Sequence, residues 1–292
     1  MAILAFHDVS YQYEQGVPVL KKLSLAIKAG EKIAVLGHNG AGKTTFFQLC
    51  NGLLAPQTGY IEHHGRIVTR KRRDLVALRK EVCMVFQEAD NQLIAPTVES
   101  EISFGPMNLG YHENEVRTLV EDVLATMQLT TLRDRPPHNL SGGEKKRVSI
   151  ADALVMNPQI LLMDEPTASL DPASALHFET LLTQLHQKGI ALMIASHDVD
   201  FAWRWATRIV VLHQGEIIAD DAPENVFAQA DILRRANLRQ PIFYEIQQLL
   251  AQERTARQEP ALGFWIKTMA DYRKYMKTRL TNCDDQTIQR TR

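Results

Sequence analysis

Residues 33–45 read Ile33-Ala34-Val35-Leu36-Gly37-His38-Asn39-Gly40-Ala41-Gly42-Lys43-Thr44-Thr45. The first four residues have the apolar character of a buried strand, and the next eight fit the pattern G-x-x-x-x-G-K-[ST]. Helical spacing begins at Thr45, so the stretch predicts a strand, a tight turn and a helix start. This pattern binds phosphate when it lies between a strand and a helix. The alternative is an ordinary glycine-rich turn, which does not require a strand before it and a helix after it. The sequence therefore predicts a phosphate-binding loop.

The residue types in this loop indicate how it would hold a nucleotide. Glycines allow backbone N–H groups to approach phosphate oxygens, and the start of a helix adds positive potential. The Lys43 side chain can reach the terminal phosphates, and the Thr44 hydroxyl is suited to Mg²⁺. We therefore expect nucleotide contacts along residues 37–45, with Mg²⁺ as a cofactor.

A second apolar run, residues 160–163, ends in the pair Asp164-Glu165, and Pro166 stops the strand directly after it. Asp164 suits Mg²⁺ and its waters, while Glu165 is placed to orient or deprotonate an attacking water. An isolated Asp-Glu pair at a strand end is usually structural. Beside a phosphate-binding loop, the pair predicts hydrolysis of a nucleoside triphosphate.

Between these motifs lies the stretch Leu140-Ser141-Gly142-Gly143-Glu144. Ser141 and Glu144 fit a capping box, which would by itself explain both residues. Two glycines in a first helical turn nevertheless cost helix stability, and they permit close approach of an external group. A helix N-terminus with a hydroxyl is a second anion site. Because one nucleotide already has its loop, this second site predicts a head-to-tail pair of subunits with nucleotide at the interface.

Taken in order, the motifs resemble the nucleotide-binding domain of ABC ATPases over about residues 3–230. The motifs are residues 37–44, Gln87, residues 140–144, Asp164-Glu165, Ser169-Leu170-Asp171 and His197. The resemblance implies an α/β P-loop NTPase fold that binds and hydrolyses ATP. It also implies an α-helical subdomain at about residues 88–158 and a small C-terminal helical extension, residues 231–292, with a basic tail.

The resemblance further implies roles for single residues. Tyr13 matches the residue that stacks on adenine, although Tyr11 is a rival, and Gln87 matches the glutamine that senses Mg²⁺ and the γ-phosphate. Asp171 matches the D-loop aspartate, and His197 matches the switch histidine at the γ-phosphate. The residues implied to act in catalysis are Lys43, Gln87, Glu165 and His197. The residues implied to bind Mg²⁺ are Thr44, Gln87 and Asp164. The signature that is implied to contact the partner's ATP consists of Ser141, Gly142, Gly143 and Glu144. Each single residue has a structural alternative: strand packing for Tyr13, an ordinary loop amide for Gln87 and a buried structural role for His197.

A finer resemblance lies in residues 86–110, 143–148 and 197–202, which are similar to the ATPases of energy-coupling-factor importers, most of all to the cobalt/nickel branch. Vitamin importers of this type use closely similar ATPases, so they remain an alternative. The resemblance implies a second ATPase subunit, identical or paralogous, and a substrate-binding membrane subunit. It also implies a membrane scaffold that docks near residues 88–105 at the cytoplasmic face of the cell membrane.

Composition limits the remaining function classes. The formal net charge of −1 gives no electrostatic case for nucleic acid binding, and the three cysteines form no C-x-x-C pair. No apolar run approaches the roughly 18 residues of a spanning helix, so transport would require separate membrane subunits. A non-transport ABC protein is a rival, but the chain has neither a second such domain nor a long coiled-coil insertion. A small-molecule kinase or a switch GTPase is disfavoured by residues 140–144.

Two further features have ordinary interpretations. The pair His63-His64 lies in a turn-like stretch and could suggest metal binding. Because an ATPase subunit acts on ATP while cargo passes through other subunits, we expect no metal there. Towards the C-terminus, residues 242–251 and 261–275 have helical spacing, and Pro241 and Pro260 bracket the first of them.

Overall fold

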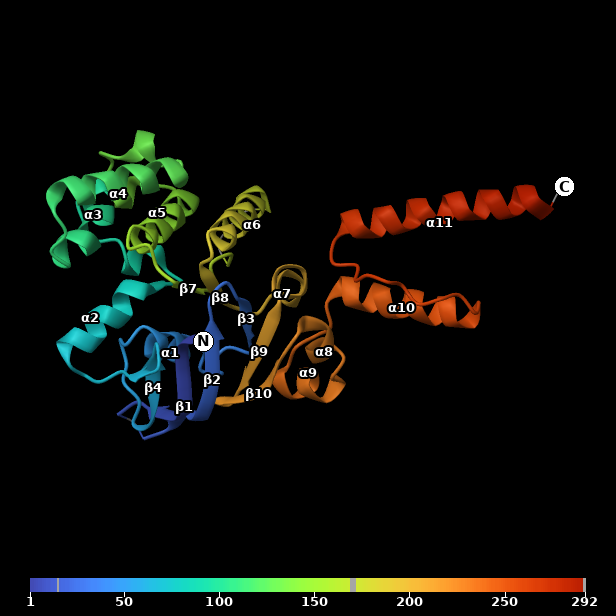
Figure 1. Ribbon diagram of the computed structural model, residues 1–292, viewed down its shortest axis with the longest axis horizontal. Coiled ribbons are helices and arrows are strands. Elements are labelled where there is room, and N and C mark those ends of the chain that lie inside the picture. The colour runs from blue at the N-terminus through green and yellow to red at the C-terminus, as the bar shows by residue number, and fades with distance from the viewer. Residues whose placement is uncertain (15, 169–171, 291–292) are drawn as a thin grey trace.

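A computed structural model of the chain describes residues 1–14, 16–168 and 172–290, which form two β-sheets with helices around them (Figure 1). Asp171, the expected D-loop aspartate, lies outside the described residues. The strands are β1 (Ala2–Gln12), β2 (Pro18–Lys28), β3 (Lys32–Leu36), β4 (Thr58–His63), β5 (Arg66–Ile67), β6 (Val82–Val85), β7 (Ile160–Asp164), β8 (Ala191–Ser196), β9 (Arg208–His213) and β10 (Glu216–Asp221).

The helices are α1 (Lys43–Cys50), α2 (Arg72–Glu81), α3 (Val98–Asn108), α4 (Glu113–Thr126), α5 (Gly142–Leu154), α6 (Pro172–Gln187), α7 (Val199–Trp205), α8 (Pro223–Phe227), α9 (Ala230–Ala236), α10 (Ile242–Ala256) and α11 (Met269–Arg290). Short 3-10 turns cover Ala89–Asn91, Thr130–Leu132 and Pro137–Asn139.

The larger sheet has the strand order β10-β9-β3-β8-β7-β6, with all neighbours parallel except the antiparallel edge strand β10. Every residue of β7 and β8 is buried. Such continuously apolar strands are typical of a parallel sheet covered on both faces. This arrangement confirms the predicted α/β P-loop NTPase fold.

The register of the parallel strands brings distant motifs to one edge of the larger sheet. Leu36, the last residue of β3, pairs with Ser196 at the end of β8, and Asp164 at the end of β7 pairs with Ala195. The glycine loop, Glu165 and His197 therefore all follow neighbouring strands at their carboxyl ends. Open parallel sheets bind ligands at this edge.

The smaller sheet is antiparallel, with the order β2-β1-β4-β5. A buried cluster between the sheets includes Phe6 of β1, Val35 of β3, and Phe46 and Phe47 of α1. A second cluster joins the other face of the larger sheet to α4, α5 and α6. Helix α1, which begins inside the glycine loop, is thus fixed by core packing on one side of the loop.

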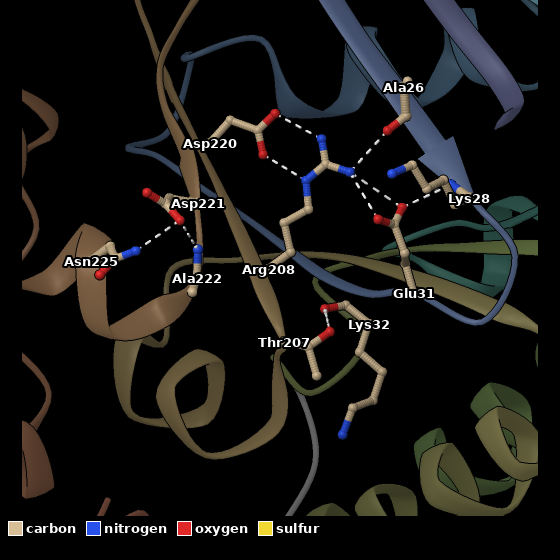
Figure 2. Close-up of polar contacts among 10 residues, drawn as sticks. All are labelled: Ala26, Lys28, Glu31, Lys32, Thr207, Arg208, Asp220, Asp221, Ala222 and Asn225. Atoms are coloured by element: carbon tan, nitrogen blue, oxygen red, sulfur yellow. Dashed lines mark hydrogen bonds and ion pairs between the residues drawn. The ribbon is translucent and has the colours of Figure 1, made fainter. Parts of the chain in front are cut away.

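Arg208 on β9 ties the two sheets together (Figure 2). Its Nε and Nη2 donate to the carboxylate of Asp220 at 2.6 and 2.7 Å, and its Nη1 donates to the Ala26 carbonyl at 2.9 Å. The same Nη1 lies 3.1 Å from Glu31 Oε1. Because the paired carboxylates favour the charged form, they raise the pKa of Arg208. One guanidinium therefore links β9, β10 and β2.

The C-terminal helices are anchored on α7 through Trp203, whose side chain is fully buried. Its indole Nε1 donates to the carbonyl of Ile266 at 3.1 Å, and its ring contacts Phe227, Tyr244 and Trp265 edge-on. Beyond this anchor, α10 and α11 project side by side from the sheets (Figure 1). The described part of the chain holds no helix with the length and apolar character needed to cross a membrane.

The helix expected over residues 261–275 is wrong in its first half, because α11 begins only at Met269. Residues before it use their backbone groups in tertiary contacts. The Ile266 N–H donates to Gln247 Oε1 at 3.0 Å, and the carbonyl of Phe264 accepts from Gln247 Nε2 at 3.2 Å. These contacts replace the helical hydrogen bonds that the spacing predicted.

Candidate functional site

The loop between β3 and α1 has a backbone that requires glycine. Gly42, directly before α1, has a φ of 104°, which side chains rarely adopt. A Cβ atom at Gly37 would lie 2.4 Å from the carbonyl oxygen of Leu212, so no larger residue fits. With these glycines, the loop can bring backbone N–H groups and the N-terminus of α1 towards an anion.

The loop borders a cavity of about 910 Å³. The expected residues that line it are Gly37, His38, Asn39, Gly40, Gly42, Lys43, Thr44, Thr45, Gln87, Asp164, Glu165 and His197. Ala41 is fully buried beneath the loop and does not line the cavity. Residues separated by more than 100 positions in the sequence thus meet around one space.

Lys43 lies under the loop with only 7% of its surface exposed. Its Nζ donates to the carbonyl of Gly37 at 2.8 Å and lies 3.7 Å from Glu165 Oε1. A buried ammonium group held in this way is a fixed positive charge at the floor of the cavity. It suits a polyanionic ligand, because hydrogen bonds between ionised groups are strong.

Thr44 and Asp164 offer oxygen ligands on the same side of the cavity. The Thr44 hydroxyl donates to Asp164 Oδ2 at 2.6 Å, and Asp164 is 3% exposed. Burial raises the pKa of Asp164, and the hydrogen bond from Thr44 opposes that rise. A hydroxyl and a buried carboxylate form the hard-oxygen donor set that Mg²⁺ prefers, so these residues fit the expected ion.

Glu165 is held by its backbone as well as by its side chain. It has a φ of 44°, uncommon outside glycine, and its N–H donates to the carbonyl of Ala195 at 3.0 Å. The carboxylate is buried, and Oε2 lies 3.0 Å from Nδ1 of His197. Oε1 has no hydrogen-bond partner within the described part of the chain. This buried oxygen therefore has an unused capacity to accept a hydrogen bond.

A family model described as ABC transporter matches residues 20–168. The chain belongs to the ABC transporter family. The energy-coupling factor transporter ATP-binding protein EcfA2 of Methanospirillum hungatei is 42% identical to this ABC ATPase over 85% of the chain. The matched region covers only 62% of that relative's length. The cobalt import ATP-binding protein CbiO of Rhodobacter capsulatus is 43% identical over 84% of this chain and 87% of its own length.

Two solved structures support the same assignment. The structure of cbiO1 from Clostridium perfringens, part of the ABC transporter complex cbiONQ, has 38% identity and a TM-score of 0.72 over 85% of this chain and 99% of its own. A dimeric ATP-binding cassette bound to ADP and Pi, in a post-hydrolysis state, has 27% identity and a TM-score of 0.68 over 75% of this chain and 98% of its own. Within its family, the chain is an ATP-binding subunit of the energy-coupling-factor and CbiO type.

Gln87 of this ABC ATPase is exposed after β6, and its side chain lines the cavity. Its backbone is fixed by Lys146 of α5, which sequence reasoning did not single out. Nζ of Lys146 donates to the carbonyls of Phe86 and Gln87 at 3.0 and 2.9 Å. Burial lowers the pKa of this lysine. Its sequence signal is its place within residues 143–148, which carry the finer family resemblance, although no role was assigned to it there.

The two candidate tyrosines for adenine stacking differ in exposure. Tyr13 is 45% exposed, and its hydroxyl lies 3.1 Å from the Thr45 hydroxyl. Tyr11 packs against the core between the sheets, and burial raises the pKa of its phenol. Tyr13 is therefore the more exposed of the two rings, in edge contact with Tyr11 at 5.1 Å between ring centroids, although it does not line the cavity itself.

Residues 141–144 form the capping box that the sequence offered as the alternative interpretation. Ser141 N–H donates to Glu144 Oε2 at 2.8 Å, and Glu144 N–H donates to Ser141 Oγ at 3.4 Å. The hydrogen bond from the Ser141 backbone lowers the pKa of Glu144. None of these four residues is among the described lining of the cavity. The start of α5 is thus capped and lies outside the lining of the cavity that the glycine loop borders.

The cavity also has a lining that the sequence did not predict, contributed by Asn237, Leu238 and Arg239 between α9 and α10. Asp200 of α7 holds this segment, because it pairs with the Arg239 guanidinium and accepts the Ile242 N–H at 2.6 Å. The only local signal is Asn237, whose φ of 54° suits an asparagine at a helix end.

Proposed function

We propose that this chain binds ATP beside residues 37–45 and hydrolyses it to energise an energy-coupling-factor importer, with cobalt or nickel as cargo. The observation that supports catalysis is the convergence of three buried charged groups, Lys43, Asp164 and Glu165, beneath one glycine loop. The support for the cargo is the similarity to a cobalt import ATP-binding protein.

In this proposal, the loop holds the phosphates. Backbone N–H groups of residues 37–45 would donate to phosphate oxygens, while Lys43 neutralises charge on the terminal phosphates. Thr44, Asp164 and Gln87 would hold Mg²⁺, which when bound supplies further positive charge to the phosphates. Tyr13 would stack on the adenine.

Glu165 would act as the general base. Its Oε1, which lies 3.7 Å from Lys43 Nζ, would accept a proton from a water molecule as the water oxygen attacks the γ-phosphorus and the bond to the bridging oxygen of ADP breaks. His197, in contact with Oε2, would keep the carboxylate in place and contact the γ-phosphate. The products are ADP and inorganic phosphate.

A second copy or a paralogue would complete each site. Because residues 141–144 do not line their own cavity, we propose that they cover ATP bound to the partner subunit. The similarity to a dimeric cassette supports this arrangement. The helical segment of about residues 230–270 would hold the two ATPases together.

The membrane scaffold would dock near residues 88–105. Two apolar side chains in this segment are unusually exposed, Ile94 at 76% and Phe104 at 53%. The backbone around Ile94 is rigid, because the buried Glu101 accepts the N–H groups of Ile94 and Ala95 at 2.8 and 2.6 Å. A fixed apolar surface of this kind suits a partner helix. The subunit would then lie at the cytoplasmic face of the membrane.

Uptake of radioactive cobalt and nickel tests the cargo directly. Cells that lack the gene should lose uptake, the wild-type gene should restore it, and Lys43→Met should fail to restore it although the protein accumulates. Loss of vitamin uptake instead would support the vitamin importers, and unchanged uptake of all these compounds would contradict an importer.

A further inference from the structure

Two histidines and a distant glutamate meet at the end of β4, in a cluster separate from the ATP cavity. His63 is the last residue of β4, His64 begins the turn to β5, and Glu81 is the last residue of α2. Both histidines contact the same oxygen, Glu81 Oε2. Nε2 of His63 lies 3.0 Å from this oxygen, and Nε2 of His64 lies 2.7 Å from it. The three donor atoms lie within 4.8 Å of one another.

The spacing of these atoms suits a small ion. Metal–nitrogen and metal–oxygen bonds of about 2.0–2.2 Å place neighbouring ligand atoms of a tetrahedral site about 3.3 Å apart. The two separations from Glu81 Oε2, 3.0 Å for His63 and 2.7 Å for His64, would need to open by about 0.3 and 0.6 Å. A water molecule can complete the coordination on the solvent side, because the His64 side chain is 40% exposed.

The surrounding structure supports the ligands. Nε2 of Gln159 donates to Glu81 Oε2 at 3.0 Å, which orients the carboxylate as outer partners of metal ligands do. The backbone of His64 is fixed, because its N–H donates to the carbonyl of Ile3 at 2.9 Å.

We propose that His63, His64 and Glu81 bind one divalent first-row transition-metal ion, such as Zn²⁺, Ni²⁺ or Co²⁺. Two imidazoles and one carboxylate suit these ions, whereas Mg²⁺ and Ca²⁺ prefer oxygen ligands. The inference does not depend on the proposed transport function. From the sequence we expected no metal at His63 and His64. That expectation considered only neighbouring residues, whereas Glu81 lies 17 residues beyond His64.

Bound metal would join two parts of the fold. His63 lies on β4 of the antiparallel sheet and His64 in the turn that follows, whereas Glu81 leads directly into β6 and Gln159 precedes β7. The ion would therefore link the β4–β5 hairpin to the edge of the larger sheet. We expect it to raise the thermal unfolding temperature of the protein, because it binds only the folded state.

Calorimetric titration of the full-length, metal-free and nucleotide-free protein with Zn²⁺, Ni²⁺ and Co²⁺ tests the proposal. Wild type should bind one equivalent, and Co²⁺ should show visible absorption bands. His64→Asn, which tolerates the left-handed backbone, and Glu81→Gln should each weaken binding by roughly tenfold or more. His112→Gln alters an exposed histidine outside the cluster and should bind as wild type does.

Two outcomes would overturn the proposal. One is the absence of saturable binding of all three ions by wild type. The other is wild-type affinity in both His64→Asn and Glu81→Gln, above all if Asp164→Asn abolishes binding, because the ion would then occupy the ATP cavity. Thermal unfolding provides an independent measure: added Zn²⁺ should raise the unfolding temperature of wild type and of His112→Gln, but not of the two ligand variants.

Discussion

Nδ1 of His197 lies 3.0 Å from Oε2 of Glu165, whereas the other oxygen of that carboxylate, Oε1, lies 3.7 Å from the ammonium group of Lys43. The two oxygens of Glu165 thus have different environments. One contacts a histidine that is 68% exposed at the rim, and the other lies above a buried positive charge. This division of contacts allows one oxygen to position the carboxylate and leaves the other for a water molecule.

Mixing two inactive variants tests whether residues 141–144 serve the partner's nucleotide. Ser141→Arg should block signature contacts, and Lys43→Ala should remove the phosphate contact. In a mixed dimer, the loop of the first variant would face the intact signature of the second. We expect ATPase activity to reappear in the mixture although each variant alone is inactive. If the signature serves its own chain, the mixture will remain inactive.

Replacement of Lys146 tests the link between α5 and Gln87. Lys146→Met leaves the carbonyls of Phe86 and Gln87 without their buried donor, so we expect the free energy of unfolding to fall by about 2–4 kcal/mol. ATP turnover should slow because Gln87 loses its anchor. Lys145→Met, which breaks an ion pair to the exposed Asp90, is the control and should cost less than about 1 kcal/mol. Wild-type turnover in Lys146→Met would contradict the link.

Asp152 provides a pH-dependent prediction. Burial raises its pKa to about 6, the hydrogen bond from Gln92 opposes this rise, and nearby Glu101 adds to it. Because the folded-state pKa lies above the unfolded value of about 3.9, the stabilising contribution is present below about pH 4 and is lost as the pH rises through about 6.

Asp152→Asn can still accept from Gln92 but cannot ionise. At pH 7.5 we expect it to be more stable than wild type by about 1–3 kcal/mol, and at pH 4.5 the advantage should shrink. Urea unfolding at both pH values measures the difference. An equal difference at the two pH values would show that Asp152 does not titrate in this range.

Arg208 should contribute to stability through its three links. Arg208→Met removes the guanidinium that pairs with Asp220 and leaves Glu31 with only the Lys28 N–H at 2.8 Å among these contacts, and we expect a loss of about 1–3 kcal/mol in urea unfolding. Breaking the exposed pair of Asp231 and Arg234 with Arg234→Met should change stability by less than about 0.5 kcal/mol. Equal effects of the two substitutions would contradict the role of Arg208.

The features predictable from sequence are those that neighbouring residues determine. The strand, glycine loop and helix of residues 33–45 follow from local patterns, and the end of β7 follows from an apolar run stopped by Pro166. The capping box of Ser141 and Glu144 is likewise a contact across three residues. Such elements could be predicted because no distant contact changes them.

The features that sequence missed depend on distant contacts. Lys146 acquires its role only because α5 packs beside β6, and Glu81 reaches the histidines only when α2 ends beside β4. The segment before Met269 has helical spacing, but Gln247 takes its backbone hydrogen bonds. Neither the spacing of apolar residues nor the composition of the chain predicts these contacts.

Hydrolysis by Glu165→Gln tests the central claim most directly. The variant keeps the size of the side chain but replaces one carboxylate oxygen with a donating amide nitrogen, which removes the negative charge and the proton acceptor beside Lys43. We predict that it binds ATP with the affinity of wild type, hydrolyses it at least about 100-fold more slowly in a single turnover, and accumulates as an ATP-bound dimer. Hydrolysis at the wild-type rate would contradict the assignment of Glu165 as the catalytic base.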